Sequence, residues 1–343
     1  MGLVSTEPAP TPVPAPRSRL AAPGDATVLA RSRDELAAAL ADAPDPRAVV
    51  MTMGALHEGH FDLVREAARR VGPAGTVVVT IFVNPLQFAP TEDLDSYPRD
   101  LEGDLAGLTQ TLTGVDGALG VGRLVVFAPT PEVIYPAGQP SVRIDPGPIA
   151  TVLEGRTRPT HFAGVCQVVL TLMHLTAPRW ALFGRKDAQQ LAIIEAMVRD
   201  LAVPLEIVPV DIRRESDGLA MSSRNAYLSP EQRRQALALS RALQAGRDAA
   251  AQAAGSGTRL DPAAIRRAAL ASLEAADGVE IDYVALVDPA GFEDLTDAGL
   301  GLPRRAPVHE DTGEGLPAVG LLAVAARVGT TRLIDNTLID LHP

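Results

Sequence analysis

Lysine is almost missing from this chain of 343 residues: of its 31 basic side chains, all but Lys186 are arginine. Arginine therefore serves wherever a general surface cation is needed. A position that keeps lysine needs a compact, mobile ammonium, which a rigid planar guanidinium cannot supply. Contact with a polyphosphate is a common need of this kind. Lys186 is therefore a candidate phosphate ligand, and its survival by chance is the alternative.

Cysteine and aromatic residues are also scarce. The single cysteine, Cys166, excludes an internal disulfide and a cysteine-rich zinc site. It lies in an apolar helical stretch and is predicted to be a small buried hydrophobe. Because aromatic residues make up only 3% of the chain, the core must consist mainly of alanine, leucine and valine. No apolar run approaches ~18 residues, so no membrane span is expected.

Basic side chains are fewer than acidic ones. The net charge is −11 and the isoelectric point about 5.1, which argues against a nucleic-acid partner. The N-terminus lacks a charged segment followed by an apolar one, so it does not resemble a secretory signal, and a cytoplasmic location is expected. The length predicts two domains.

Three regions follow one another along the chain. Residues 1–26 hold six prolines and are predicted to form a disordered tail. In residues 27–212, β-branched apolar runs alternate with helical patterns, which predicts an α/β fold with a Rossmann-like open parallel sheet. Residues 213–343 predict a smaller α+β lid domain, in which residues 302–316 form a loop. The predicted strands are 48–53, 77–83, 124–128, 180–183 and 205–210, then 279–289 and 320–328; helices are expected over 61–71, after Ser229 and after Asp261.

The segment MTMGALHEGH carries a histidine pair. A predicted strand ends at Met53, and His57 and His60 then lead into a helix. Unpaired backbone N–H groups at a helix start bind anions, so the two imidazoles are candidate donors to a phosphoryl group. The dipole at this end favours neutral imidazole, whereas a bound triphosphate favours the protonated form. A pair of zinc ligands or two surface histidines are the alternatives.

Two further segments offer phosphate contacts. Ser222, Ser223 and Arg224 lie in DGLAMSSRN, a segment that is able to close over a leaving pyrophosphate as a mobile loop. The alternative is an ordinary turn before a capped helix. Lys186 and Asp187 follow a predicted strand in FGRKDAQQ, with Gln190 in the same segment. Asp187 and Gln190 otherwise indicate a helix cap and a solvated helix face.

Of two other segments, one suits a hydroxylated carboxylate substrate and one suits phosphate oxygens. Asn84 and Gln87 follow the most apolar strand in FVNPLQF, and amides both donate and accept hydrogen bonds. Arg158 and His161 precede a helix in the segment LEGRTRPTHFAGV, where an arginine is able to bind phosphate oxygens. Each segment taken alone also suits an ordinary surface loop. The common nucleotide motifs GxGxxG and the Walker loop are absent from the sequence.

Taken together in chain order, the segments resemble the pantoate–β-alanine ligase family of the HIGH-type nucleotidyltransferase superfamily. The resemblance covers residues 48–230 and includes the SYPRD stretch; it resumes more weakly at ARVGTTRLIDN, residues 326–336. It implies a Rossmann-like domain, a smaller C-terminal domain and a homodimer. It also implies that pantoate and MgATP give pantoyl adenylate and pyrophosphate, after which β-alanine displaces AMP to give pantothenate.

The resemblance also implies roles for individual residues. His60 matches the histidine that donates a proton, and His57, Lys186 and Arg224 join it as catalytic candidates. Arg213 falls where the family contacts adenine through its backbone. The implied ATP site comprises Met53, Gly54, Ala55, Leu56, His57, Glu58, Gly59, His60, Gly184, Arg185, Lys186, Asp187, Arg213, Met221, Ser222, Ser223 and Arg224. Gln87 and Gln190 match the pantoate-binding glutamines; the full candidate set for pantoate and β-alanine adds Asn84, Arg158 and His161.

The sequence departs from the family pattern at three positions. Met51 replaces a proline, and Arg185 stands where glutamate or glutamine is usual. Gly103 interrupts an acidic run that some relatives use near magnesium, which leaves Asp104 as a candidate ligand. We therefore expect the ATP phosphates themselves to hold most of the Mg²⁺ coordination.

The chemistry needs positioned cations more than a base. A carboxylate is already ionised at neutral pH, since its typical pKa is ~4. Adenylation then requires alignment and stabilisation of charge on the phosphoryl oxygens. Three other classes remain as alternatives: an aminoacyl-tRNA synthetase-like enzyme, a cytidylyl- or adenylyltransferase, and a nucleotide-binding regulator without turnover. The acidic net charge and the Lys186 segment count against the first two.

Overall fold

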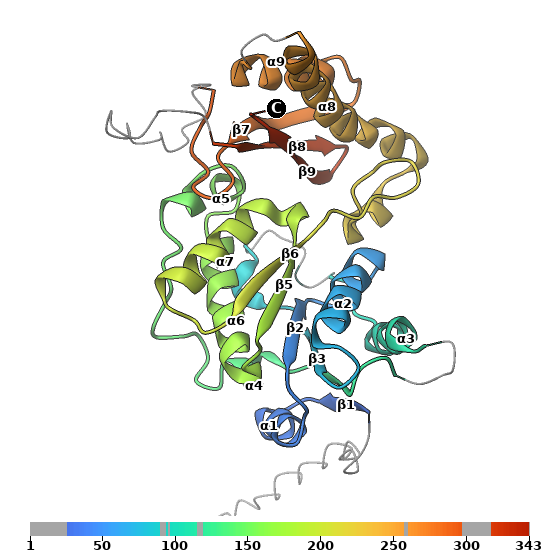
Figure 1. Ribbon diagram of the computed structural model, residues 1–343, viewed down its shortest axis with the longest axis vertical. Helices are drawn as coiled ribbons and strands as arrows, with labels where there is room; N and C mark the ends of the chain where they lie inside the picture. The colour runs from blue at the N-terminus through green and yellow to red at the C-terminus, as the bar shows by residue number, and fades with distance from the viewer. Residues whose placement is uncertain are drawn as a thin grey trace, which may run out of the picture.

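The computed structural model describes residues 26–89, 94, 97–114, 119–256, 260–296 and 317–342. In these residues the chain forms a six-stranded sheet with flanking helices and, stacked on it along the long axis, a three-stranded sheet with two helices (Figure 1). The predicted tail lies outside the described residues, except for Ala26, and so does the predicted loop at 302–316.

The larger sheet is parallel throughout, as the continuous apolar runs predicted. Its strand order is β1-β4-β3-β2-β5-β6. Five strands lie within a few residues of the predicted ranges, but β1 was not predicted, because four residues are too short to show a periodicity. The strands are β1 (Thr27–Ala30), β2 (Arg47–Thr52), β3 (Thr76–Ile81), β4 (Arg123–Phe127), β5 (Trp180–Gly184) and β6 (Glu206–Val210).

Helices cover both faces of this sheet. Along β2, Val49 packs into the core on one face, whereas Ala48 and Val50 pack into the core on the other. The first core receives α1 (Arg33–Ala41), α6 (His161–Thr176) and α7 (Ala188–Asp200); the second receives α2 (Glu58–Val71) and α3 (Leu101–Leu112). Cys166 of α6 is buried in the first core, as predicted. The architecture is therefore a doubly wound Rossmann-like sheet.

The order of the strands fixes where a ligand binds. β2 lies between β3 and β5, so the chain builds the sheet outward in one direction from β2 and later in the other direction from β5. In such sheets ligands bind at this switch point, beyond the carboxyl ends of the strands. Residues 53–60 follow β2 and residues 185–187 follow β5. Two of the predicted phosphate-binding segments thus emerge side by side.

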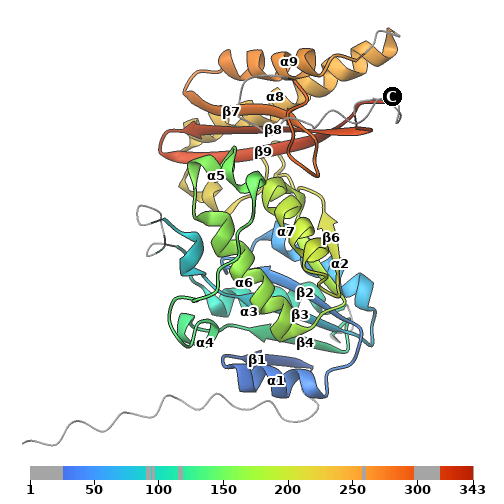
Figure 2. The same ribbon diagram turned by 90° about the vertical axis from the view of Figure 1, so that its left-hand side faces the viewer.

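The C-terminal part is an antiparallel sheet of β7 (Val279–Val287), β8 (Val319–Val328) and β9 (Thr331–Asp340). One face carries α8 (Pro230–Gly255) and α9 (Pro262–Glu274). Ser229 and Gln232 form the predicted capping box at the start of α8. The other face packs on the larger domain, where Tyr283 and Leu321 share a core with Leu153 and Ala192 (Figure 2).

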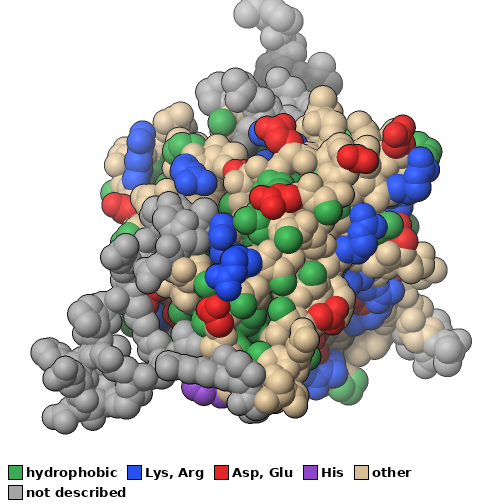
Figure 3. Space-filling model, turned by 90° about the horizontal axis from the view of Figure 1, so that it is seen from above, with side chains coloured by type: hydrophobic (Ala, Val, Ile, Leu, Met, Phe, Trp, Pro, Cys, Tyr) green, Lys and Arg blue, Asp and Glu red, His purple; other side chains and the backbone are tan. Residues whose placement is uncertain are grey.

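Short helical segments connect these elements: η1 (Pro85–Gln87), α4 (Pro131–Ile134), η2 (Pro148–Thr151), α5 (Glu154–Thr157), η3 (Arg185–Asp187) and η4 (Ser223–Tyr227). Among the described residues, no helix is both long and apolar enough to cross a membrane. Seen from above, the face over the C-terminal helices shows acidic and basic side chains interspersed (Figure 3).

Candidate active site

A tight turn follows β2 and begins the site. Gly54 has φ +89°, a conformation that glycine adopts readily and L side chains rarely do. The buried carboxylate of Asp104 on α3 accepts hydrogen bonds from the backbone N–H groups of Ala55 (3.1 Å) and Leu56 (2.7 Å), one at each oxygen. Burial raises the pKa of Asp104, although these two hydrogen bonds oppose the shift. Asp104 therefore holds the turn that precedes the histidines, and its role as a candidate magnesium ligand stays a prediction.

The two histidines lie at the first turn of α2, as predicted. His57 is the N-cap, and its Nδ1 accepts from the backbone N–H of Gly59 (3.2 Å). Nδ1 of His60 accepts in turn from the backbone N–H of His57 (3.3 Å), and the ring centroids are 4.1 Å apart. In a neutral imidazole that accepts at Nδ1, the proton is carried by Nε2. Both rings are therefore arranged as neutral donors through Nε2.

The protonation state of the pair agrees with this arrangement. Burial, with a smaller contribution from His57, lowers the pKa of His60 to about 3. Burial and the nearby Lys186 ammonium lower the pKa of His57 as well. Both shifts favour neutral imidazole in the ligand-free protein, the form that the helix dipole was also expected to favour, and burial is the largest cause of each.

Lys186 lies in η3, directly after β5. Its Nζ is 3.8 Å from Oδ1 of Asp187, and its side chain is 22% exposed. The neighbouring Arg185 pairs with Asp211 at the surface. Asn336 of β9 donates to the backbone carbonyls of both Arg185 (3.0 Å) and Lys186 (2.9 Å). The lysine backbone is therefore held by the C-terminal sheet.

The Ser-Ser-Arg segment lies against the start of α2. Gly59 N–H donates to Sδ of Met221 at 3.3 Å, and Met221 N–H donates to the carbonyl of Arg213 at 2.9 Å. Ser222 caps η4 by accepting from Arg224 N–H. The Arg213 side chain pairs with Asp62 of α2, and the predicted adenine contact involves its backbone rather than this side chain.

The predicted substrate-binding amides form a connected group after β3. Asn84 is buried and donates to Oε1 of Gln87 (3.2 Å) and to the carbonyl of Gly164 (3.0 Å), while its own oxygen accepts from Tyr135 OH (2.9 Å). Both donors of Asn84 are thus occupied. Gln87 Nε2 lies 2.8 Å from Sδ of Met53. Asn84 accordingly orients Gln87.

Arg158 and His161 reach the same group from the start of α6. Nη2 of Arg158 donates to the carbonyl of Gln87 at 3.3 Å, and Nδ1 of His161 lies 3.0 Å from that oxygen. Nη1 of Arg158 is 3.2 Å from Nε2 of His161. Because Nε2 faces an obligate donor, it is an acceptor, and Nδ1 carries the proton toward Gln87.

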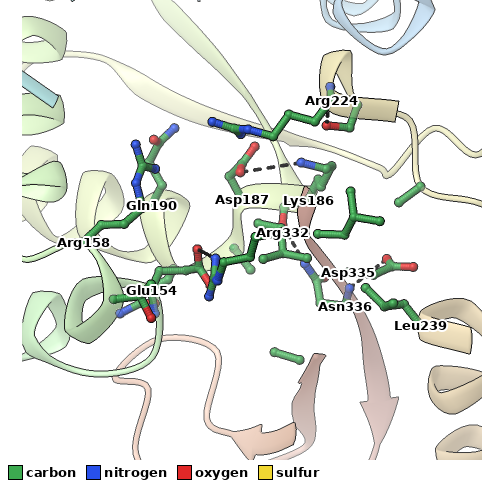
Figure 4. A pocket seen from close by; sticks show the side chains of 18 of the residues that line it. Glu154, Arg158, Lys186, Asp187, Gln190, Arg224, Leu239, Arg332, Asp335 and Asn336 are labelled. Atoms are coloured by element: carbon green, nitrogen blue, oxygen red, sulfur yellow. Dashed lines mark hydrogen bonds and ion pairs between the residues drawn. The ribbon is translucent and has the colours of Figure 1, made fainter. Parts of the chain in front are cut away.

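A cavity of about 540 Å³ lies between the two sheets, and Figure 4 shows several of its charged side chains. The predicted residues that line it are Arg158, His161, Lys186, Asp187, Gln190, Ser222 and Arg224. The other predicted residues lie outside its lining: residues 53–60, Asn84, Gln87, Gly184, Arg185, Arg213, Met221 and Ser223. Two contacts link these residues to the lining: Arg158 and His161 both contact the backbone carbonyl of Gln87, and the positive charge of Lys186 helps to lower the pKa of both histidines.

An ion-pair network beside the cavity was not predicted. Arg332 of β9 donates to both oxygens of Glu154 (2.7 and 2.6 Å) and to Asp282 of β7 (2.9 Å). Tyr283 donates to Glu154 at 2.9 Å. Burial opposes the charge of Arg332, but the bonds to the two carboxylates raise its pKa. Arg332 lies in ARVGTTRLIDN, a stretch that resembles the family pattern but for which the sequence analysis gave no role.

A Rossmann-like sheet with neutral imidazoles at a helix start and cations across a cleft defines a nucleotide-using enzyme that activates a small substrate. The family model described as pantoate-beta-alanine ligase matches residues 28–338. The chain is 46% identical to a pantothenate synthetase from Streptomyces avermitilis, over 90% of this chain and 97% of that one.

Solved structures agree with this match. The pantothenate synthetase of Thermus thermophilus has a TM-score of 0.75 and 40% identity, covering 92% of this chain and all of that one. A pantoate-β-alanine ligase from Francisella tularensis, complexed with beta-gamma ATP and β-alanine, has a TM-score of 0.61 and 28% identity over 91% and 98% of the chains. This chain therefore belongs to the pantoate–β-alanine ligase family.

Membership settles the class of activity: the protein is an ATP-dependent ligase of pantothenate synthesis. The family match therefore replaces the three alternatives, which were an aminoacyl-tRNA synthetase-like enzyme, a cytidylyl- or adenylyltransferase and a nucleotide-binding regulator. It agrees with the family that the sequence segments indicated.

Proposed function

We propose that this protein condenses (R)-pantoate with β-alanine to give pantothenate, AMP and pyrophosphate through a pantoyl-adenylate intermediate, as a step toward coenzyme A. One observation supports this most strongly. The hydrogen bond from Gly59 to Met221 brings the histidine turn and the Ser-Ser-Arg segment to the same edge of the sheet as Lys186. A single nucleotide bound there would contact all three.

In the first step the pantoate carboxylate attacks the α-phosphorus of ATP, and the bond to pyrophosphate breaks. The carboxylate is ionised at neutral pH, so no general base is required. Charge grows on the phosphoryl oxygens and on the leaving group, where fixed donors stabilise it. His57 and His60 donate through Nε2, and Lys186 and Arg224 supply positive charge. Because burial lowers the pKa of His60 in the ligand-free protein, we propose that its neutral ring donates a hydrogen bond and does not act as a cation.

Pantoate is oriented by the amide group after β3. Gln87 and Gln190 bind its hydroxyl and carboxylate oxygens, and Asn84 fixes Gln87 from behind. Arg158 and His161 complete this side of the site, since both contact the backbone of Gln87. The side chains supply donors and acceptors at short range, which suits a substrate that is both an alcohol and a carboxylate.

In the second step the amine of β-alanine attacks the acyl carbon, an amide bond forms and AMP leaves. The adenylate is sensitive to water, so residues 217–224 are expected to close over it while pyrophosphate departs. In this account residues 27–212 form the ATP- and pantoate-binding domain, and residues 213–343 form the lid. Ser222 and Ser223 contribute neutral donors to the pyrophosphate.

Magnesium enters with ATP. In the part of the chain that the structure describes, no group of three or more histidine, cysteine or acidic side chains is arranged to hold a metal ion. Both oxygens of Asp104 accept from backbone N–H groups. We therefore assign Mg²⁺ to the phosphate oxygens, where it would neutralise charge on the triphosphate. The family resemblance further supports a homodimer in the cytoplasm that acts on small molecules and not on nucleic acid.

The direct test is AMP release from ATP, pantoate and β-alanine, compared with reactions that lack one substrate in turn. AMP should form in quantity only with all three present, and pyrophosphate exchange into ATP should require pantoate but not β-alanine. AMP release that is independent of pantoate would contradict the proposed substrate. A need for β-alanine in the exchange reaction would contradict the adenylate.

A further inference from the structure

Two consecutive residues of β9, Asp335 and Asn336, are both buried, at 3% and 5% exposure. Burying polar groups is costly unless they form hydrogen bonds. Each of these side chains reaches out of its own sheet and contacts a different loop of the site. Figure 4 shows the pair beside Lys186 at the same cavity.

Asn336 holds the lysine loop. Its Nδ2 donates to the carbonyls of Arg185 at 3.0 Å and of Lys186 at 2.9 Å, so both amide hydrogens are used. These carbonyls lie in η3, between β5 and α7, where the chain makes a single short turn. Fixing the two peptide planes fixes the direction in which the Lys186 side chain leaves the backbone. The contact is made from a strand that is 150 residues away in sequence.

Asp335 holds the other loop. It accepts two hydrogen bonds from Arg214, at 2.7 and 3.0 Å, in the bidentate arrangement that guanidinium and carboxylate favour. Arg214 also donates to the carbonyl of Gly218, and its backbone bridges that of Ala220. This small hairpin leads directly into residues 221–224. Asp335 therefore anchors the base of the Ser-Ser-Arg segment.

We propose that Asp335 and Asn336 form a positioning unit, which sets the relative placement of the ammonium of Lys186 and the guanidinium of Arg224 across the triphosphate. Neither residue needs to touch a substrate. The unit is made of two adjacent residues on β9. The C-terminal sheet therefore fixes the two phosphate-binding loops at a set distance from each other. The inference rests on the proposed role of Lys186 and Arg224 in adenylation.

The central test is a double-mutant cycle between Asn336→Leu and Lys186→Ala. Leucine has a similar shape but removes both donors. Pantoate-dependent ATP–pyrophosphate exchange should fall by about 10²-fold in Asn336→Leu, the order expected for a catalytic group displaced by roughly 1 Å. The same substitution should cost nothing further in the Lys186→Ala background, because the group that it positions is already gone.

A second readout separates positioning from general damage. Pantothenate formation from supplied pantoyl adenylate and β-alanine does not use the triphosphate contacts, so Asn336→Leu should retain nearly the wild-type rate in this half-reaction. Asn336→Asp keeps the shape, but its carboxylate cannot donate to the carbonyls. It should likewise lose pyrophosphate exchange and retain the half-reaction from supplied adenylate. Rates are normalised to the folded fraction of each sample by circular dichroism. Asp340→Asn, an exposed change on the same strand, is the matched control.

The outcomes distinguish the inference from the function on which it rests. Exchange at the wild-type rate in Lys186→Ala alone would overturn the role of the lysine. A loss in Lys186→Ala together with wild-type exchange in Asn336→Leu, or with losses that add, would overturn the positioning unit and leave the function standing. Equal losses in both half-reactions would also overturn it. The parallel cycle of Asp335→Asn with Arg224→Ala tests the other loop by the same criterion.

Discussion

The backbone N–H of Gly59 points at the sulfur of Met221 across 3.3 Å, although the two residues are 162 positions apart in sequence. Gly59 belongs to the first turn of α2, between the two histidines, and Met221 begins the Ser-Ser-Arg segment. This contact joins the histidine turn to the Ser-Ser-Arg segment at the carboxyl edge of the large sheet, where Lys186 also lies. The proposed chemistry depends on that juxtaposition.

Gly59 allows the His57 ring to cap the helix. A Cβ at this position would lie 3.1 Å from Cε1 and 3.2 Å from Nδ1 of His57, so Gly59→Ala must push the ring aside. We expect pyrophosphate exchange to fall by about 10-fold or more as the donor moves. The net change in stability should be small, because the helix preference of alanine over glycine, up to about 1 kcal/mol, offsets the weakened cap.

The matched control for this substitution is Gly255→Ala at the end of α8, where a Cβ would meet nothing within 4 Å. This variant should exchange pyrophosphate at the wild-type rate. Full activity in Gly59→Ala, with an unchanged His57 position, would contradict the capping role.

Asp104→Asn should weaken adenylation without changing the need for magnesium. The amide keeps only one acceptor oxygen for the two N–H groups of Ala55 and Leu56, so the turn before the histidines loosens. Initial rates are measured over a magnesium titration, and Glu102→Gln, an exposed change on α3, is the control. A marked rise in the magnesium concentration for half-maximal rate in Asp104→Asn alone would instead indicate a metal ligand.

Because the pKa of His60 is lowered in the folded protein, we expect the free energy of unfolding to depend on pH. The group titrates near 6.5 when unfolded and at about 3 when folded, so below pH 6.5 the unfolded state binds a proton that the folded state does not. The free energy of unfolding should therefore decrease as the pH falls from 6.5 toward 3, by at most about 1.4 kcal/mol per pH unit from this group. His60→Asn should show a shallower slope between pH 6.5 and 5 in urea unfolding. Equal slopes in the two proteins would contradict a His60 imidazole that stays neutral in the folded protein below pH 6.5.

The network around Arg332 is expected to stabilise the contact between the two sheets. Arg332→Ala leaves the partly buried carboxylates of Glu154 and Asp282 close together without a cation, which should cost about 2 kcal/mol, less than the loss of a fully buried pair. The matched control is Arg267→Ala, which removes a surface pair with Asp261 that is worth at most about 1 kcal/mol. Denaturant unfolding compares the two variants. Similar small losses in both would mean that the network does not hold the domains together.

Much of this structure could be predicted because its signals are local. Five apolar runs gave five parallel strands, and the capping box at Ser229 gave the start of α8. The histidine turn follows β2 where the sequence placed it. These features depend on periodicity or on contacts within a few residues, which a single sequence displays.

The features that could not be predicted depend on contacts between distant residues. Asp335 and Asn336 make the sequence of β9 look polar, so the strand could not be recognised from an apolar pattern. The two side chains are nevertheless buried, because they bind Arg214 and the backbone near Lys186. The sequence offered Asp104 only as a candidate magnesium ligand and gave no sign of its turn-holding contacts, since its partners are backbone N–H groups on another element. Buried polar residues that serve a remote loop leave no pattern of their own in the sequence.

Pyrophosphate exchange in Lys186→Ala tests the central claim most directly, with His60→Ala as its companion and Arg199→Ala, a surface cation on α7 paired with Asp200, as the control. Loss of a fixed donor at the developing charge should lower the pantoate-dependent rate by about 10²–10³-fold in the first two proteins, with folding intact, and leave the control unchanged. Exchange at the wild-type rate in Lys186→Ala would contradict the assignment of this cleft to the adenylation of pantoate.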